Sequence, residues 1–294
     1  MENNSLQKKT ILVTGANGQL GREFQQLEES YSNYSFLFLT KEQLSITDEN
    51  AVNDFFINNR VHICINCAAY TAVDKAETER ETAIAVNANA VGYLAKACKN
   101  YNAYFFHIST DYVFDGKGTH PYTENEPTNP VNFYGQTKLN GEVNALKENE
   151  QSIIIRTAWV YSSFGNNFLK TMIRLMNERE SIGVVNDQYG CPTYAADLAA
   201  AIMQIIESNN FVAGVYHYSN TGKISWYDFA KEIATQTNSI CVVNSITKSQ
   251  FPTPAARPSY SVLDTTKIAE RFNLDIPKWD DSLKKCLSLI KQTA

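Results

Sequence analysis

From residue 10 to about residue 158, short runs of hydrophobic residues alternate with longer segments whose hydrophobic residues recur every three or four positions. The first pattern is typical of buried strands and the second of amphipathic helices. Nearly continuous hydrophobic strands favour a parallel sheet that helices cover on both faces, so we predict a doubly wound α/β domain. The expected strands are 10–13, 36–39, 62–67, 103–108 and 152–156, and the expected helices are 19–29, 49–58, 81–100 and 134–148.

After residue 158 this alternation becomes less regular. We expect helices at 167–178, 193–207, 225–237 and 281–290, a strand at 214–218 and a proline-bearing loop at 251–258. Thr193 and Ser225 are the predicted N-caps of their helices. Because no linker rich in Gly or Ser separates the halves, a smaller lobe should pack on the first domain with a cleft between them. We predict a larger domain of residues 1–160 with 193–220, and a smaller lobe of residues 161–192 with 221–294.

Composition and charge exclude several classes of protein. Hydrophobic residues make up 44% of the 294 residues, which excludes a disordered or low-complexity chain. The net charge is −5 and no basic cluster is present, so neither nucleic acid nor an anionic membrane is expected as a partner. The hydrophobic stretch near 195–206 is too short to span a bilayer. Residues 1–10 lack the hydrophobic core of a signal peptide, so we expect a cytoplasmic protein.

The six cysteines are scattered along a chain too large to depend on disulfides, and we expect them to remain thiols. Cys64 and Cys67 have the C-x-x-C spacing of some metal and redox sites. They lie in a predicted strand, however, where alternation points them to opposite faces. Small buried side chains are therefore the better interpretation.

The clearest local signal is Ile11-Leu-Val-Thr-Gly15-Ala-Asn-Gly18-Gln-Leu-Gly21, a hydrophobic strand that leads through three glycines into a helix. Gly15 tolerates backbone angles closed to other residues, and Gly18 allows a pyrophosphate to approach the N–H groups of the helix. Gly21 allows the helix to pack closely on the strand. At the start of a β-α-β series, this pattern predicts a dinucleotide-binding site.

In dinucleotide-binding domains an acidic residue commonly follows the second strand and binds the adenosine ribose. Here Thr40 and Lys41 occupy that position. Lys41 could accept a 2′-phosphate, which favours NADPH over NADH, although a solvated loop lysine remains the alternative.

Two further groups of residues suggest proton-transfer chemistry. Tyr134 and Lys138 are four residues apart on a predicted helix and so share one face. A nearby cation would lower the pKa of the phenol toward the working range of an acid–base catalyst. Ser109 and Thr110 follow a predicted strand, and ligands of parallel sheets lie beyond the carboxyl ends of the strands. Helix surface and capping are the structural alternatives for the two groups.

Together these residues resemble the extended short-chain dehydrogenases/reductases that act on nucleotide sugars, and the resemblance covers nearly the whole chain. It includes the glycine pattern, Asn66-Cys-Ala-Ala69, Asn87, Ser109-Thr110-Asp111, and Tyr134 with Lys138. Longer strings make it more specific: Ala69-Tyr-Thr-Ala-Val-Asp74-Lys-Ala-Glu77, Ser109-Thr-Asp-Tyr-Val-Phe-Asp115-Gly116, Arg156-Thr-Ala-Trp159-Val-Tyr161, Gly165-Asn-Asn-Phe168, Asn186-Asp-Gln-Tyr-Gly190-Cys-Pro192-Thr193 and Pro254-Ala-Ala-Arg257-Pro258.

The resemblance implies reduction of the C4 keto group of dTDP-4-dehydro-L-rhamnose by NADPH or NADH, giving dTDP-L-rhamnose for cell-surface polysaccharide. Tyr134 would donate the proton, Lys138 would hold the nicotinamide ribose and lower the pKa of Tyr134, and Thr110 would bind the carbonyl oxygen. The implied cofactor contacts are Gly18, Gln19 and Leu20 at the pyrophosphate, Ser45 and Ile46 near the adenine, and Ala69, Tyr70 and Thr71 along the cofactor. The implied sugar-nucleotide contacts are Asp111, Trp159 and Arg257.

Several alternatives remain open at this point. Trp159 could be a core aromatic, and Arg257 could form a surface ion pair. A dehydratase or epimerase of the same fold is a second function, although dehydratases typically have Asp then Glu after the strand-end Thr, and Tyr112 follows Asp111 here. A non-catalytic regulatory subunit of the methionine adenosyltransferase type is a third. We predict no catalytic metal, because the carboxylates lack recognisable ligand spacing, and a homodimer is compatible with the resemblance.

Overall fold

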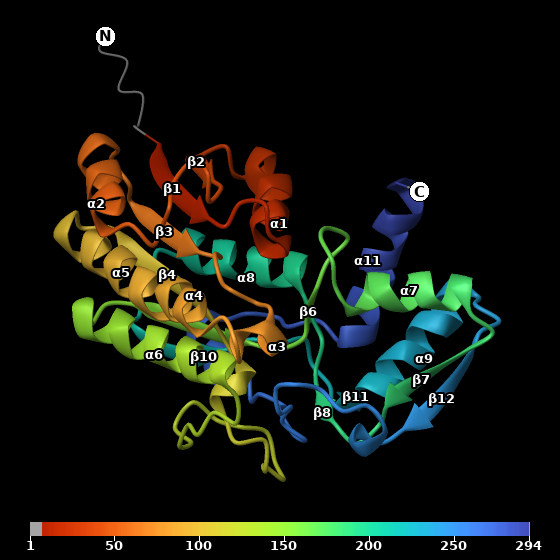
Figure 1. Ribbon diagram of the computed structural model, residues 1–294. Helices are drawn as coiled ribbons and strands as arrows, with labels where there is room; N and C mark the ends of the chain where they lie inside the picture. Colours follow the sequence, from red (N-terminus) through yellow and green to blue (C-terminus); the bar gives the residue numbers. More distant parts are fainter. Residues whose placement is uncertain (1–7, 294) are drawn as a thin grey trace.

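The computed structural model describes residues 8–293, and its centre is a six-stranded parallel sheet (Figure 1). The strand order is β10-β5-β4-β3-β1-β2, which is the doubly wound arrangement that the sequence predicts. The strands are β1 (Lys9–Thr14), β2 (Tyr34–Leu39), β3 (Ile63–Asn66), β4 (Tyr104–Thr110), β5 (Ile153–Thr157) and β10 (Gly214–His217). Residues 1–10, in which the sequence predicts no signal peptide, lie mostly outside the described residues.

Helices cover both faces of this sheet because alternate residues of each strand point to opposite sides. Leu12 of β1 faces α2 (Glu49–Asn58), α5 (Ala90–Asn100) and α6 (Phe133–Glu148), whereas Ile11 and Val13 face α1 (Gln19–Leu27), α8 (Ala195–Glu207) and α10 (Thr266–Phe272). Cys64 packs on the first side and Cys67 on the second, as their spacing predicts. All six cysteines are free thiols.

The segment predicted as one helix over 81–100 is divided by a π-helical turn, η2 (Ala85–Asn89), between α4 (Arg80–Ile84) and α5. The turn orients Asn87, whose amide oxygen accepts a hydrogen bond from the Tyr70 N–H at 2.8 Å. Its amide nitrogen donates to the Tyr70 carbonyl oxygen at 3.0 Å. Tyr70 is thereby held beside the end of β3.

The smaller lobe has a hydrophobic core of its own, formed by α7 (Phe168–Glu178), α9 (Trp226–Thr237) and α11 (Trp279–Thr293) with β7 (Ser181–Val185). β7 pairs in parallel with β12 (Val242–Ile246), and β8 (Tyr189–Gly190) pairs antiparallel with β11 (Ile224–Ser225). Ser225 caps α9 as predicted, in a reciprocal capping box with Asp228. The remaining short helices are η1 (Glu28–Tyr31), α3 (Val73–Ala76), η3 (Asp111–Val113) and η4 (Lys248–Gln250).

The prediction that Thr193 caps a helix is wrong. Thr193 and Tyr194 form the short strand β9, which pairs with β6 (Val160–Tyr161), and α8 begins only at Ala195. The Thr193 hydroxyl instead accepts a hydrogen bond from Thr157 at 3.1 Å, which joins the connection between the lobes to the end of β5.

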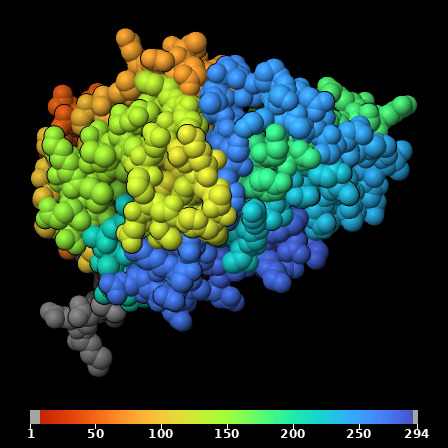
Figure 2. Space-filling model, turned by 90° about the horizontal axis from the view of Figure 1, so that it is seen from below, coloured from red at the N-terminus to blue at the C-terminus, as the bar shows by residue number. Residues whose placement is uncertain are grey.

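The later part of the chain returns to the larger domain in two places. Ile268 and Phe272 of α10, which the sequence analysis placed in the smaller lobe, lie in the hydrophobic core on the α8 face of the sheet. Tyr122 bonds through its backbone to Val262 and Asp264, so the loop of residues 115–130 (yellow) lies against the blue C-terminal segment in Figure 2. The exact division into two lobes stays a prediction.

Among residues 8–293, none of the helices is both long and apolar enough to span a membrane.

Candidate active site

The glycine-rich turn that follows β1 shapes the first part of the site. Gly15 has φ of +68°, and a Cβ on it would lie 2.6 Å from the Ala68 nitrogen, so the turn requires glycine. Gly18 is the N-cap of α1 and offers no side-chain cap to the first N–H groups of the helix. These donors and the helix dipole suit an anion such as a pyrophosphate.

Two adjoining cavities open on this turn, and Asn17, Gly18, Cys67 and Ala69 line both. The smaller cavity has a volume of about 470 Å³ and the larger about 610 Å³. The predicted residues on the smaller are Gly15, Gly18, Thr40, Lys41, Ser45, Ile46, Ala69 and Tyr70. Those on the larger are Gly18, Gln19, Leu20, Ala69, Thr71, Thr110, Asp111, Tyr134, Lys138 and Trp159. A long ligand with its phosphates at Gly18 would extend into both, which fits a dinucleotide.

Two predicted residues do not line either cavity. A Cβ on Gly21 would lie 2.5 Å from the Gly15 carbonyl oxygen, so Gly21 allows α1 to pack on the turn. Arg257 lies near Tyr112 and forms an ion pair with Asp74 at 2.9 Å, which is the alternative that the sequence left open.

Thr110, Tyr134 and Lys138 all face the larger cavity. Thr110 ends β4, and its hydroxyl donates to the Asp111 carboxylate at 2.9 Å and lies near the Tyr134 phenol. Lys138 lies one turn after Tyr134 on α6, and its amine donates to the Ile108 carbonyl oxygen at 2.6 Å. The three groups come from two elements that meet at the carboxyl end of the sheet.

The protonation of these groups departs from one expectation. Burial raises the pKa of Tyr134, the nearby Thr110 hydroxyl partly opposes this shift, and the Asp111 carboxylate raises the pKa further. Lys138, which was expected to lower the pKa of Tyr134, is not among these influences, and burial determines the direction of the shift. The effect of Lys138 on the phenol stays a prediction. Burial also lowers the pKa of Lys138 to about 8.

Asp111 is almost fully buried beside Thr110. Burial raises its pKa to about 6, although hydrogen bonds to the carboxylate, including the one from Thr110, oppose the shift. The nearby Ser261 hydroxyl donates to the Tyr189 carbonyl oxygen instead, at 3.5 Å, so the Oδ2 atom of Asp111 has no hydrogen-bond partner among the described residues. An unsatisfied buried carboxylate oxygen at a cavity wall is suited to binding a ligand hydroxyl.

A buried ion pair that the sequence analysis missed holds β4, β5 and α6 together below the cavity. Arg156 of β5 donates two hydrogen bonds to Glu142 of α6, at 2.7 and 2.9 Å. The Ser109 hydroxyl donates to the same carboxylate, so Ser109 is engaged in this network. No motif links these positions in the sequence, and only the fold places them together.

Two tryptophans form the wall of the larger cavity next to the smaller lobe. The indole of Trp159 stacks on that of Trp226, with ring centroids 3.5 Å apart and an angle of 11° between the planes. Trp159 has φ of +49°, a left-handed conformation that is costly for a bulky residue and often marks functional sites. Trp226, the first residue of α9, was not predicted, and its place at the start of a helix is the only signal for it.

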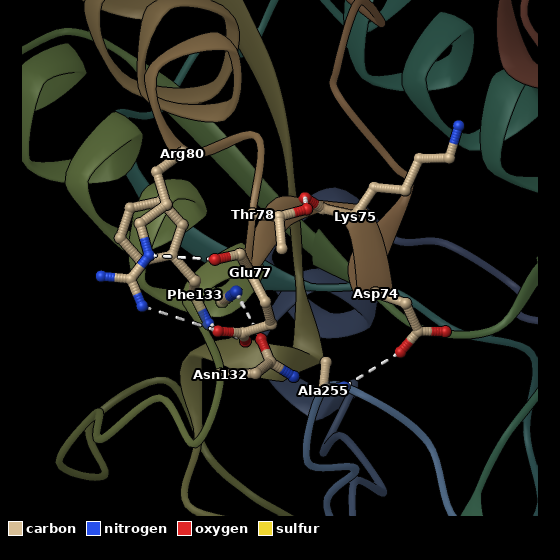
Figure 3. A network of polar contacts seen from close by, with 9 residues as sticks. Asp74, Lys75, Glu77, Thr78, Arg80, Asn132, Phe133 and Ala255 are labelled. Carbon is tan, nitrogen blue, oxygen red and sulfur yellow. Dashed lines mark hydrogen bonds and ion pairs between the residues drawn. The ribbon is translucent and has the colours of Figure 1, made fainter.

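A second network fixes the N-terminus of α6, next to Tyr134 (Figure 3). The Glu77 carboxylate accepts a hydrogen bond from the Phe133 N–H at 2.9 Å, and the Arg80 guanidinium lies over the Phe133 ring. Asn132 caps the helix by accepting from the Gly135 N–H and donates to the Ala256 carbonyl oxygen. The segment after β3 and the proline-bearing loop therefore both anchor the helix that carries Tyr134.

Comparison with known proteins adds to this geometry. The family described as "RmlD substrate binding domain" matches residues 9–292. The chain is 40% identical over 284 residues to dTDP-4-dehydrorhamnose reductase of Aggregatibacter actinomycetemcomitans, a match that covers 93% of this chain and 97% of that protein. The chain belongs to the dTDP-4-dehydrorhamnose reductase family. This places it among the relatives that the sequence resemblance indicated.

Solved structures from this family have the same fold. A dTDP-4-dehydrorhamnose reductase from Clostridium acetobutylicum matches with a TM-score of 0.92 and 42% identity, covering 96% of this chain and 99% of that one. The enzyme from Bacillus anthracis, in complex with NADP, matches with a TM-score of 0.92 and 40% identity, covering 96% of this chain and all of the other. In the described part of this family member, no group of three or more His, Cys, Asp or Glu side chains is arranged to hold a metal ion.

Proposed function

We propose that this chain reduces the C4 keto group of dTDP-4-dehydro-L-rhamnose to dTDP-L-rhamnose, a donor for polysaccharide synthesis. The observation that supports this most directly is that Thr110, Tyr134 and Lys138 line one cavity, which continues to the glycine-rich turn at Gly18. Membership in the dTDP-4-dehydrorhamnose reductase family supports the choice of substrate.

A bound reduced nicotinamide would supply the hydride for the C4 carbon. Tyr134 remains protonated at neutral pH because burial raises its pKa, so the phenol can give its proton to the oxygen that gains charge. The Thr110 hydroxyl, which lies near the phenol, would turn its proton from Asp111 to the same oxygen. Lys138 in its protonated form would add positive charge that stabilises the developing negative charge.

The proposed cofactor site follows the two cavities. The phosphates would lie at Gly15, Gly18, Gln19 and Leu20, with Gly21 supporting the turn. Thr40, Lys41, Ser45 and Ile46 would hold the adenosine, and Ala69, Tyr70 and Thr71 would border the cofactor along its length. The nicotinamide would lie near Tyr134 and Lys138. NADPH is the preferred cofactor in this proposal because Thr40 and Lys41 come directly after the second strand, ahead of Glu42, and Lys41 lines the smaller cavity.

The proposed sugar-nucleotide site is the wall of the larger cavity on the side of the smaller lobe. Thr110 would donate to the carbonyl oxygen of the sugar, and Asp111 would accept from a sugar hydroxyl. The indole of Trp159 would pack on the ligand. Arg257 lines neither cavity but lies near Tyr112 on the wall of the larger one. Its Nη1 atom, which is buried and has no hydrogen-bond partner among the described residues, would bind phosphate. In this proposal residues 1–160 with 193–220 bind the cofactor, and the smaller lobe binds the substrate.

A stoichiometric assay tests the proposal against the alternatives. We expect purified protein to oxidise one NADPH for each dTDP-4-dehydro-L-rhamnose consumed and to release NADP⁺ and dTDP-L-rhamnose. A dehydratase or an epimerase would transform its sugar nucleotide with no net oxidation of NADPH. A regulatory subunit would bind NADPH and convert no sugar nucleotide.

A further inference from the structure

Four buried polar side chains lie in a row below the larger cavity, and the proposed mechanism uses only the last of them. Thr14 of β1, Asn66 of β3, His107 of β4 and Lys138 of α6 are each no more than 2% exposed. Their polar atoms contact one another in that order, across three neighbouring strands and into the helix. A buried polar chain of this kind has defined donors and acceptors.

The contacts of Asn66 determine where His107 carries its proton. The Asn66 Oδ1 atom accepts hydrogen bonds from the Thr14 hydroxyl at 2.7 Å and the Ala68 N–H at 3.2 Å. The amide nitrogen is therefore the atom 3.1 Å from His107 Nδ1, and Nδ1 must be the acceptor. Burial and the charge of Lys138 lower the pKa of His107, so the ring is neutral and its single proton lies on Nε2.

This tautomer directs an N–H group at Lys138. The His107 Nε2 atom lies 3.5 Å from Lys138 Nζ. A lysine ammonium has no lone pair, so it cannot accept a hydrogen bond from the ring, whereas the uncharged amine can. The amine still donates to the Ile108 carbonyl oxygen in either form.

We propose that His107 is a positioning residue for Lys138, which favours the uncharged amine by presenting its Nε2–H to it. The proposal rests on the proposed function only for the part that Lys138 plays in catalysis. The other titratable groups acting on Lys138 are Glu142 of the same helix and Cys67 after β3, which both favour the charged form. Glu142 already pairs with Arg156, so its charge is partly neutralised. Its stabilisation of the Lys138 ammonium, which His107 opposes, is weakened accordingly.

The consequence is a lysine that titrates near the working pH. An ordinary lysine has a pKa of about 10.4 and would remain charged throughout the physiological range. Burial lowers the pKa of Lys138 to about 8, and the Nε2–H of His107 would add to this shift, so Lys138 can gain or lose its proton near the working pH. Reduction should then slow above about pH 8 as the ammonium is lost.

The variant His107→Asn tests this directly in the full-length protein. An asparagine oxygen can replace Nδ1 as the acceptor for Asn66, while the group that faces Lys138 is removed. We expect the NMR titration of the Lys138 Cε carbon to move up by at least about one pH unit, and the alkaline limb of kcat to move with it. Phe105→Leu is the matched control, because Phe105 lies two residues earlier on the same face of β4 and should leave both titrations unchanged.

Two results would overturn the proposal: an unchanged Lys138 titration in His107→Asn, or a wild-type His107 ring that carries its proton on Nδ1 in a ¹⁵N NMR spectrum. The ring measurement needs no variant, so it decides the matter even if His107→Asn fails to fold. Both NMR readouts are independent of turnover. A protein that fails as a reductase would still give a clear answer about His107 and Lys138.

Discussion

The guanidinium of Arg257 lies 2.9 Å from the carboxylate of Asp74, and this ion pair joins the proline-bearing loop to α3. The same carboxylate accepts a hydrogen bond from the Ala255 N–H at 3.1 Å. Val73, the residue before Asp74, lines the larger cavity. The pair therefore connects the loop before residue 258 to the wall of the proposed cofactor and substrate site.

Arg257→Gln separates phosphate binding from this structural role. Because Nη1 has no partner, we expect the variant to raise KM for the sugar nucleotide about tenfold, the value of one charged hydrogen bond, with KM for NADPH unchanged. Asp74→Asn breaks the ion pair and leaves Arg257 present, and should change KM less than about threefold because partly exposed pairs contribute little. If the two variants have equal KM values for the sugar nucleotide, Arg257 acts only through its ion pair with Asp74.

Lys41 is expected to determine cofactor preference. Its exposed side chain lies at the smaller cavity, where it can reach a 2′-phosphate. Steady-state kinetics should give a lower KM for NADPH than for NADH, and Lys41→Ala should raise only the NADPH value, by about threefold to tenfold. Lys147→Ala, at an exposed lysine of the last turn of α6, is the control. Equal or reversed constants in the wild type would remove this role for Lys41.

Asp111→Asn should stabilise the protein while reducing its activity. The folded-state pKa of Asp111 is about 6, above the ordinary value of about 3.9, so its stability contribution is greatest below the ordinary pKa and is lost as pH rises through 6. Removing the charge should therefore add about 2 to 3 kcal/mol to the free energy of unfolding at pH 8, and little at pH 4.

Asp115→Asn is a control because it should change the free energy of unfolding in the opposite direction. Hydrogen bonds from the Lys117 N–H and the Tyr122 hydroxyl hold the pKa of Asp115 below its usual value. Its substitution should lower the free energy of unfolding at neutral pH. Denaturant unfolding that gives both variants the same sign at pH 8 would contradict the assignment of Asp111 as a buried, destabilised carboxylate.

Gly21→Ala and Gly92→Ala compare two glycines within helices. A methyl group on Gly21 would lie 2.5 Å from the Gly15 carbonyl oxygen, so α1 must move and we expect a loss of about 1 to 3 kcal/mol with weaker NADPH binding. A methyl group on Gly92 first meets the Asn144 side chain at 3.4 Å, an ordinary contact. That variant should be neutral or more stable by up to about 1 kcal/mol. Similar melting temperatures for the two variants would be inconsistent with this packing.

The central strands β1 to β5 were predictable because each is a compact hydrophobic run in a chain that alternates such runs with helical segments. β10 was also predicted, as a strand after this alternation becomes less regular. The smaller lobe was less predictable. β7 and β12 were missed because half of their residues are exposed and neither strand has the continuous hydrophobic pattern of a central strand. Thr193 has the chemistry of an N-cap, but pairing with β6 holds it in an extended strand.

The residues of the candidate site also differ in how far the sequence predicts them. Local motifs identified Gly18, Thr110, Tyr134 and Lys138, because strand ends and helix periodicity determine which way those groups point. Contacts between distant segments gave no such signal. Tertiary packing determines the partners of Lys138, the ion pair of Glu142 with Arg156 and the stacking of Trp226. The raised pKa of Tyr134 likewise follows from burial, which spacing alone does not report.

The most direct test of the central claim is the turnover of Tyr134→Phe with NADPH and dTDP-4-dehydro-L-rhamnose, followed by the loss of nicotinamide absorbance. Phenylalanine keeps the ring and removes only the hydroxyl that would donate the proton. We predict that kcat falls by more than about 100-fold while the Kd for NADPH changes less than about threefold. Turnover close to the wild-type rate would contradict the account, as would a wild-type protein that binds NADPH but reduces no sugar nucleotide.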